Sequence, residues 1–353
     1  MCNIAGYIGE RRAAPILIEM LRRQEGLNAG FYTGIATLHE GKIHYRKLVG
    51  NLDDLLSQTD AADLPGCIGI IHSRTPGATK SEGTEYAHPF VVEQNGTLTT
   101  AMVLNGTAGF FKPRREARVA LTQAMLADGI FLRSHCKGEG NLNLPDGTCV
   151  HSSEVFCRQA DLRYHEGLAL HAAAAQAFCD MPTEAVILML SLAKQDAITY
   201  ARFNFPMHLA HANHGTYLAT SPQAMPDDAG DYHLLPLRSS GYIYKDHFEC
   251  YPFPEKIASI APLTPSRRAK ILEIITQKLR GGEQTVSTLA EAIRPAFDGY
   301  DCGQVGAAIY PILDELERNG KLHRERRYID GQFPGLKAPL DYMWLEKLAP
   351  FGD

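Results

Sequence analysis

The order of the strand-like and helical segments is the feature that most constrains the fold of this chain. Strand-like runs at 3–9 and 31–50 and a hairpin signal at Asn95-Gly96 come first, helical patterns at 113–127 and 153–179 follow, and further strand-like runs come last. This order favours two antiparallel sheets packed between helical layers over a parallel βαβ array. We therefore predict an α+β fold, and no segment is typical of a nucleotide-binding fold.

A proline-rich segment at 251–265 predicts a linker between a first domain at 2–250 and a second at 266–353. Beyond the linker, three helical patterns precede one basic segment: RRAKILEIITQKL, STLAEAIRPAF, GAAIYPILDELERNG and KLHRERRYIDG. Three helices and a hairpin-like wing outline a winged-helix-like domain. Pro311 and the neighbouring acidic residues in the third helix weigh against DNA binding.

Composition limits the class of protein. The chain has 353 residues, of which 45% are hydrophobic and 21% charged, and its net charge of −5 gives no global basic field for nucleic acid. No apolar run approaches the roughly 20 residues needed to span a bilayer, and the N-terminus lacks the pattern of a signal peptide. We predict a cytoplasmic protein with no membrane contact and no cofactor. A homo-oligomer stays open.

Cys2 is the most informative single residue. Removal of Met1 would expose a cysteine that carries both a thiol and a free α-amine, so that nucleophile and base come as one unit. An α-amine titrates near ~7.7–8.0 and a thiol near ~8.5, which allows proton transfer around neutral pH. A Met-Cys start alone is weak evidence, because many chains have cysteine second for no chemical reason.

The residues around Cys2 strengthen the case for a catalytic role of this cysteine. The opening MCNIAGYIG resembles the MCGI-G-IG start of class II, N-terminal-nucleophile (Ntn) glutamine amidotransferases, above all the glutaminase half of glucosamine-6-phosphate synthase. Further similar blocks follow in the family's order: LRRQEG, KLVGNLDDLL, IGIIHSRTPGAT, AHP, VLNG, SSEV and YLATSPQAMP. The resemblance covers roughly residues 2–250. It implies a four-layer αββα Ntn-hydrolase sandwich.

The resemblance also implies roles for individual residues. Arg74 corresponds to the arginine that grips the α-carboxylate of glutamine, and a guanidinium matches a carboxylate with two parallel hydrogen bonds. Thr79 occupies the place of a substrate-contacting threonine. Asn105 and Gly106 match the pair that forms the oxyanion hole, where each donor is typically worth about 3–4 kcal/mol. They end a strand, whereas Asn95-Gly96 suits a hairpin turn.

Some positions depart from the family pattern. Asn3 replaces a glycine, NAGFYT replaces YRGYDS, and Lys80 replaces a histidine. Ser152 aligns with the aspartate that pairs with the α-ammonium of glutamine, and a hydroxyl cannot supply that charge. Because an insertion at about 134–150 precedes this site, the counterpart could instead be one of three acidic residues: Glu154, Asp146 or Glu139. The substrate could therefore be glutamine or a related amide.

Two groups of residues contain histidine or cysteine, the side chains that most often bind transition metals. His135, Cys136, Cys149 and His151 present one cysteine and one histidine on each side of the insertion, a set that zinc could bind. Their irregular spacing and the absence of a CxxC pair argue against it. His208, His211 and His214 lie around a strand end. Residues three apart in a strand point to opposite faces, so these histidines are interpreted as structural. We predict no metal site.

The predicted function is that of a glutamine amidotransferase, or glutaminase, that releases ammonia through a thioester on Cys2. The region after residue 265 is too short for the acceptor modules of the family. This predicts either a synthase or acceptor subunit as partner or a stand-alone amidohydrolase. The alternative is a non-catalytic sensor of a glutamine-like metabolite that acts through the winged-helix-like domain. Loss of ammonia release in Cys2→Ala would support the enzyme over the sensor.

Overall fold

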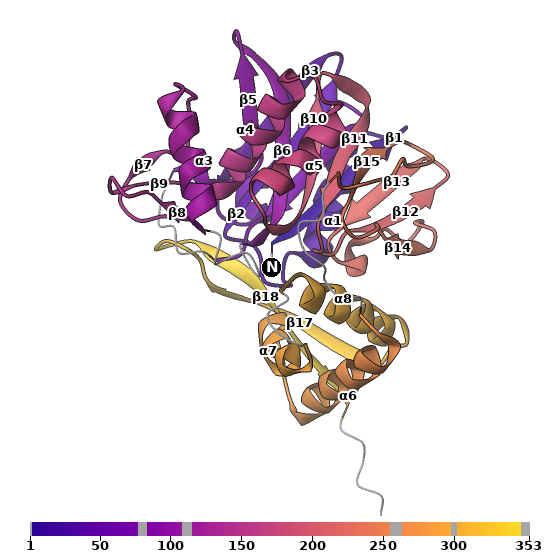
Figure 1. The fold of residues 1–353 in the computed structure, drawn as a ribbon. Coiled ribbons are helices and arrows are strands. Elements are labelled where there is room, and N and C mark those ends of the chain that lie inside the picture. The colour runs from indigo at the N-terminus through magenta and orange to yellow at the C-terminus, as the bar shows by residue number, and fades with distance from the viewer. Residues whose placement is uncertain (1, 77–82, 108–114, 255–262, 298–301, 347–353) are drawn as a thin grey trace, which may run out of the picture.

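The chain was analysed as a computed structural model that describes residues 2–76, 83–107, 115–254, 263–297 and 302–346. Two antiparallel sheets lie face to face, and helices cover both outer faces (Figure 1). The layers follow the order helix, sheet, sheet, helix, which confirms the predicted antiparallel α+β architecture. In the described part of the chain, no helix combines the length and the apolar character that crossing a membrane requires.

The first sheet has seven strands with β1 near its centre. In spatial order they are β14 (Tyr232–Leu234), β12 (His208–Ala212), β13 (Gly215–Ala219), β1 (Asn3–Gly9), β4 (Ile68–Ser73), β2 (Tyr32–His39) and β3 (Lys42–Val49). Helices α1 (Ala13–Gln24) and α2 (Leu52–Gln58) cover its outer face. The apolar residues of α1 recur at helical spacing, so Leu17, Met20 and Leu21 are all buried against this sheet.

The second sheet has six strands. Their spatial order is β16 (Tyr251–Pro252), β15 (Ser239–Ile243), β11 (Lys194–Arg202), β10 (Glu184–Ser191), β6 (Thr97–Thr107) and β5 (Phe90–Gln94). Three helices lie along its outer side: α3 (Arg115–Ala127), α4 (Ser152–His165) and α5 (Leu170–Asp180). Every residue of β10 is buried because this central strand contacts the other sheet on one face and helices on the other.

Alternation along the strands separates the cores. In β6, Val103 faces the first sheet and packs with Leu188 and Ile4, whereas Leu104 faces the helices. Burying each such aliphatic side chain contributes roughly 1.5–3 kcal/mol relative to exposure. The sandwich therefore fixes which residues of β6 can reach the face covered by α3 and α4.

Local chain signals explain most of the boundaries. Asn95 and Gly96 have φ values of 50° and 76° and join β5 to β6, which confirms the predicted hairpin. The helix predicted over 153–179 is wrong as a single element, because it divides into α4 and α5. Gly167 between them has a φ of 99°, a left-handed conformation that a continuous helix cannot contain.

The inserted segment folds into a small sheet of its own. Its strands, in spatial order, are β7 (Cys136–Lys137), β9 (Thr148–Val150) and β8 (Leu142–Asn143). Tyr86, which ends a short 3₁₀ helix, donates its hydroxyl to the carbonyl of Ser134 at 3.0 Å and so anchors the start of this segment. Strand β9 leads directly into α4, so the insertion helps to position the first turn of that helix.

The C-terminal part contains three helices and a hairpin. They are α6 (Pro265–Gly281), α7 (Val286–Ile293), α8 (Cys302–Arg318), β17 (Leu322–Asp330) and β18 (Lys337–Leu345). Ile271, Leu289 and Leu313 form a core with residues of the hairpin, and Gln284 makes an isolated bridge to Met343. Thr264 caps α6 and precedes Pro265 at the first helical position. Of the predicted linker, β16 belongs to the second sheet and residues 255–262 lie outside the described residues.

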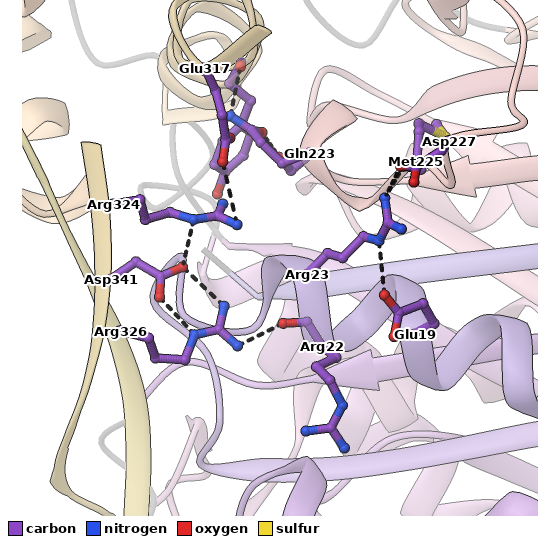
Figure 2. A network of polar contacts seen from close by, with 12 residues as sticks. Glu19, Arg22, Arg23, Gln223, Met225, Asp227, Glu317, Arg324, Arg326 and Asp341 are labelled. Atoms are coloured by element: carbon purple, nitrogen blue, oxygen red, sulfur yellow. Dashed lines mark hydrogen bonds and ion pairs between the residues drawn. The ribbon is translucent and has the colours of Figure 1, made fainter. Parts of the chain in front are cut away.

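The hairpin packs against the N-terminal part of the molecule. Asp341 of β18 is 1% exposed and accepts hydrogen bonds from Nε and Nη2 of Arg326 at 2.7 and 3.0 Å, as Figure 2 shows. Arg326 also donates to the carbonyl of Arg22 in α1. A Cβ on Gly26 would lie 2.1 Å from the Asp341 carboxylate, so only glycine permits this approach. The acidic residue thus joins the hairpin to the end of α1.

Candidate active site

Cys2 directly precedes β1, the central strand of the first sheet, and lies beside the loop that follows β4. Because β1 and β4 are antiparallel and Asn3 pairs with Ser73, the residues after β4 come next to Cys2. The Cys2 Sγ lies 3.7 Å from Thr75 Oγ1, and the side chain is half-buried. A cavity of about 340 Å³ has Cys2, Arg74 and Thr75 in its wall.

Arg74 is held rigidly at this cavity. Its side chain is buried, its Nη1 donates to the carbonyl of Tyr86 at 3.3 Å, and its guanidinium lies 4.8 Å from the centre of the Tyr32 ring. Burial lowers the pKa of Arg74, and the nearby Cys2 thiol opposes this effect. Among the described residues, no carboxylate pairs with Arg74. It is therefore a positioned cation beside the proposed nucleophile.

The two residues of the predicted oxyanion hole have different surroundings. Gly106 lies in the cavity wall, and a Cβ there would meet the Glu184 carbonyl at 2.3 Å, so strand packing by itself requires glycine. Asn105 is fully buried between the sheets, where its Nδ2 donates to Thr220 Oγ1 at 3.3 Å. This bond uses one of the two amide hydrogens, and the side chain does not line the cavity, so Asn105 would have to reorient to reach an oxyanion. Its catalytic role stays a prediction.

Ser152 is the first residue of α4 and lines the cavity together with Asn141. The Ser152 backbone N–H donates to Asn141 Oδ1 at 2.9 Å, and the Ser152 hydroxyl donates to the same oxygen. The insertion therefore contributes to the site through Asn141, a residue that sequence comparison did not single out. Thr79 and Lys80 lie outside the described residues.

The three acidic alternatives to Ser152 do not line the cavity. Glu154 is buried, and its carboxylate accepts from the backbone N–H groups of Arg133 and Ser134 at 2.7 and 2.8 Å. Asp146 is exposed in a turn, where it accepts from the Thr148 N–H at 3.0 Å, and Glu139 is also exposed. Among the described residues, none of these three carboxylates is therefore placed to pair with the α-ammonium of a substrate in the cavity.

Sequence reasoning missed Arg118 and two buried histidines, His72 and His88, and considered His151 only as a possible metal ligand. Arg118 of α3 is 5% exposed and reaches the cavity wall, where its Nη2 donates to Thr183 Oγ1 at 3.0 Å. An arginine four and seven residues before the buried Thr122 and Met125 of the same helix is the signal that could have revealed it.

His72, His88 and His151 form a group of neighbouring rings, and His88 and His151 line the cavity. The rings of His72 and His88 lie 3.9 Å apart, and His88 is 5.5 Å from His151. Burial lowers the pKa of His72 to about 3 and holds the pKa of His88 and of His151 well below the ordinary value. All three are therefore neutral at pH 7.

The possible zinc ligands of the insertion do not converge on one point. The Sγ atoms of Cys136 and Cys149 are 3.5 Å apart, but the exposed His135 ring contacts Thr148 Oγ1 at 3.0 Å. The Nδ1 atom of His151 accepts from the Ser153 N–H at 3.2 Å. Within the ranges that the structure describes, no group of three or more histidine, cysteine or acidic side chains is arranged to hold a metal.

The fold matches solved amidotransferases. The glutamine phosphoribosylpyrophosphate amidotransferase from B. subtilis aligns with a TM-score of 0.57 and 16% identity, over 92% of this chain and 66% of that one. A structure described as the allosteric regulatory enzyme of purine biosynthesis aligns with a TM-score of 0.58, 16% identity and coverage of 93% and 67%. These likenesses show that the chain shares the fold of these enzymes, with its antiparallel sheets.

Sequence relatives point to the same class. The glutamine–fructose-6-phosphate aminotransferase of Pyrococcus horikoshii is 39% identical over 106 residues, which are 28% of this chain and 17% of that protein. The enzyme of the same name from Caldanaerobacter subterraneus subsp. tengcongensis is 38% identical over 119 residues, or 33% and 18%. No family profile matches the chain. The N-terminal region of the chain is thus homologous to these aminotransferases, as its motifs predicted, and the match covers less than a fifth of their length.

Proposed function

We propose that this protein is a glutamine amidotransferase that releases ammonia from a side-chain amide through a thioester on Cys2. The observation that carries the proposal is the single cavity wall shared by Cys2, Arg74 and Gly106. The antiparallel pairing of β1 with β4 brings the nucleophile beside the arginine, although 72 positions separate them in the sequence. The homologous aminotransferases carry glutamine in their names and support this activity.

The chemistry uses groups of one residue. After removal of Met1, the α-amine of Cys2 takes the proton of the thiol, and the thiolate forms a bond to the amide carbon of the substrate. The carbon–nitrogen bond then breaks as the α-ammonium returns a proton to the departing ammonia. Water, deprotonated by the same amine, cleaves the thioester and regenerates the thiol. Gly106, with Asn105 turned from Thr220, would stabilise the negative oxygen during both additions.

The C-terminal part supports a winged-helix-like domain at 266–353 that follows the proposed amidotransferase domain at 2–250. Its helix α8 faces the first domain rather than solvent. Tyr232 donates to Asp314 of α8 at 2.8 Å, and Gln223 donates to the Tyr310 carbonyl at 3.4 Å. A helix occupied in this way cannot enter a DNA groove, so the proposal includes no DNA binding. Ammonia would pass to an acceptor site on a partner subunit in the cytoplasm.

The sensor alternative is not favoured by the homologues, and Cys2 provides its test. The purified chain is incubated with a glutamine-like electrophile, its mass is measured, and ammonia release is assayed. Labelling of Cys2 alone, loss of Met1 and at least a ~1000-fold loss of activity in Cys2→Ala would support the enzyme. Cys67→Ala is the matched control because that thiol is also half-buried and lies away from the cavity lining. Full activity in Cys2→Ala would overturn the proposal.

A further inference from the structure

The described part of the cavity wall is rich in cations and hydrogen-bond donors but contains no carboxylate. Its lining includes two guanidinium groups, those of Arg74 and Arg118. Glutamine carries an α-ammonium as well as an α-carboxylate, and a buried ammonium needs an anionic partner to offset its desolvation. The described part of the wall therefore offers cationic partners for the carboxylate of glutamine and no anionic partner for its ammonium.

Arg118 is the strongest sign of a second anion site. The Nη2 atom donates to Thr183 Oγ1 and to the Pro182 carbonyl, and the buried Nε has no hydrogen-bond partner. Among the described residues, no carboxylate lies within ion-pair distance of it. Burial lowers the pKa of Arg118 to about 10, so the guanidinium stays charged at neutral pH. A buried cation without a counter-ion favours a ligand that supplies one.

The start of α4 adds donors on the same wall. Because His151 Nδ1 accepts from the Ser153 N–H, the proton of this neutral ring resides on Nε2. That Nε2 is buried and has no partner, and His151 lines the cavity. The Ser152 hydroxyl is committed to Asn141, and the N-terminal end of a helix carries a partial positive charge. These groups would bind an anion and repel an ammonium.

From this arrangement we infer that the preferred substrate is a side-chain amide with two anionic groups and no free ammonium. One anion binds Arg74, as in the proposed function on which this inference rests. The second anion binds Arg118 and takes the position that an ammonium would need. An Nα-acylated glutamine whose acyl group ends in a carboxylate has this chemistry. Hydrolysis of its side-chain amide still follows the Cys2 route and releases ammonia.

The test compares three amides with the processed wild-type enzyme: L-glutamine, Nα-acetyl-L-glutamine and Nα-succinyl-L-glutamine. The kcat/KM for ammonia release should rise about tenfold from glutamine to the acetyl compound, because the ammonium is removed. It should rise about tenfold again for the succinyl compound, whose extra carboxylate can form charge-assisted hydrogen bonds. This comparison needs no variant, so it holds even if substitutions in the wall impair folding.

Variants then assign the effect to individual residues. Arg118→Gln should abolish the advantage of the succinyl over the acetyl compound, so that the two amides give equal kcat/KM in this variant. Arg115→Gln is the matched control, since this exposed arginine lies on the same helix and should change neither rate. Ser152→Asp restores a carboxylate at the start of α4 and should raise kcat/KM for glutamine about tenfold.

The outcomes separate this inference from the proposed function. Equal rates, or a preference for glutamine with Cys2 still labelled, would overturn the dianionic substrate and leave the amidotransferase intact. A preference for the acetyl compound without a further gain from succinyl would overturn the Arg118 subsite. If no amide releases ammonia and Cys2 stays unlabelled, the proposed function itself fails.

Discussion

Two groups of buried or half-buried arginines in this molecule meet opposite surroundings. At the junction with the hairpin, Asp341 accepts two hydrogen bonds from Arg326 and lies 3.9 Å from Arg324. Burial lowers the pKa of Arg326, but the bonds to Asp341 outweigh burial and raise it. In the cavity, the partners of Arg74 and Arg118 within the described ranges are carbonyl and hydroxyl groups and the Tyr32 ring. Burial lowers the pKa of both arginines.

This difference separates a structural role from a ligand-binding role. A cation that is neutralised inside the protein has no remaining demand for an external anion, and its loss costs stability. A cation buried without a carboxylate is costly to the folded state and is offset only when an anionic ligand arrives. The junction arginines should therefore control stability, and the cavity arginines should control substrate binding.

The largest effect on stability is expected from Asp341→Asn. The variant leaves Arg326 without its carboxylate and Arg324 with Glu317 alone. Removing one partner of a buried ion pair typically costs about 3–5 kcal/mol. Urea unfolding should show this loss in the free energy of unfolding. Asp330→Asn, at the exposed end of the same hairpin, should leave the midpoint unchanged. A stable Asp341→Asn protein would break the distinction between the two groups.

Glu25 extends the comparison to a buried carboxyl. Burial raises its pKa from 4.5 to about 7, and hydrogen bonds from Ser73 and Leu52 oppose that rise. Since the folded state keeps its proton while the unfolded state loses it, stability falls as pH rises from about 4.5 through 7. The total is about 3 kcal/mol.

Glu25→Gln should remove this part of the pH dependence, so the stability difference between variant and wild type should grow in favour of the variant above pH 5. Urea unfolding at several pH values measures it. Glu19→Gln, which removes an exposed carboxyl in α1, the helix that Glu25 follows, serves as the control. Parallel curves for wild type and Glu25→Gln would contradict the raised pKa.

Arg74→Lys should act on catalysis rather than on folding. Lysine keeps the charge but cannot form the two parallel bonds to a carboxylate, so kcat/KM for ammonia release should fall roughly 10- to 100-fold. The unfolding free energy should change by less than about 1 kcal/mol, because no internal carboxylate loses its partner. Steady-state kinetics and urea unfolding on one preparation test both halves. A stability loss without a kinetic loss would place Arg74 with the junction arginines.

The smallest effect is expected from Arg327→Gln. This arginine pairs with Glu283 and Glu325 on the surface, where solvent screens the charges. Neither the unfolding midpoint nor ammonia release should change measurably. A clear loss of stability would show that an exposed ion pair also stabilises the protein. Burial would then not distinguish the junction arginines from this one.

Part of the fold and site could be predicted from short-range patterns. The Asn95-Gly96 turn and the apolar run of β10 depend on local backbone and burial preferences, which the sequence displays directly. The motifs around Cys2, Arg74 and Gly106 identified three residues that the cavity wall unites. The prediction of one helix over 153–179 was wrong because Gly167 adopts a left-handed conformation that ends the first helix, although the surrounding residues favour helix.

By itself, the sequence determined the class of the protein, because Cys2 and the blocks after it keep the order that an Ntn amidotransferase requires. Only the tertiary structure decided what surrounds the substrate. Arg118 reaches the cavity because α3 packs on the second sheet. Glu154 does not line the cavity because its carboxylate accepts hydrogen bonds from the backbone N–H groups of residues 133 and 134. Charge balance in a cavity is a sum over residues that are distant in sequence, so it becomes visible only when the chain is folded.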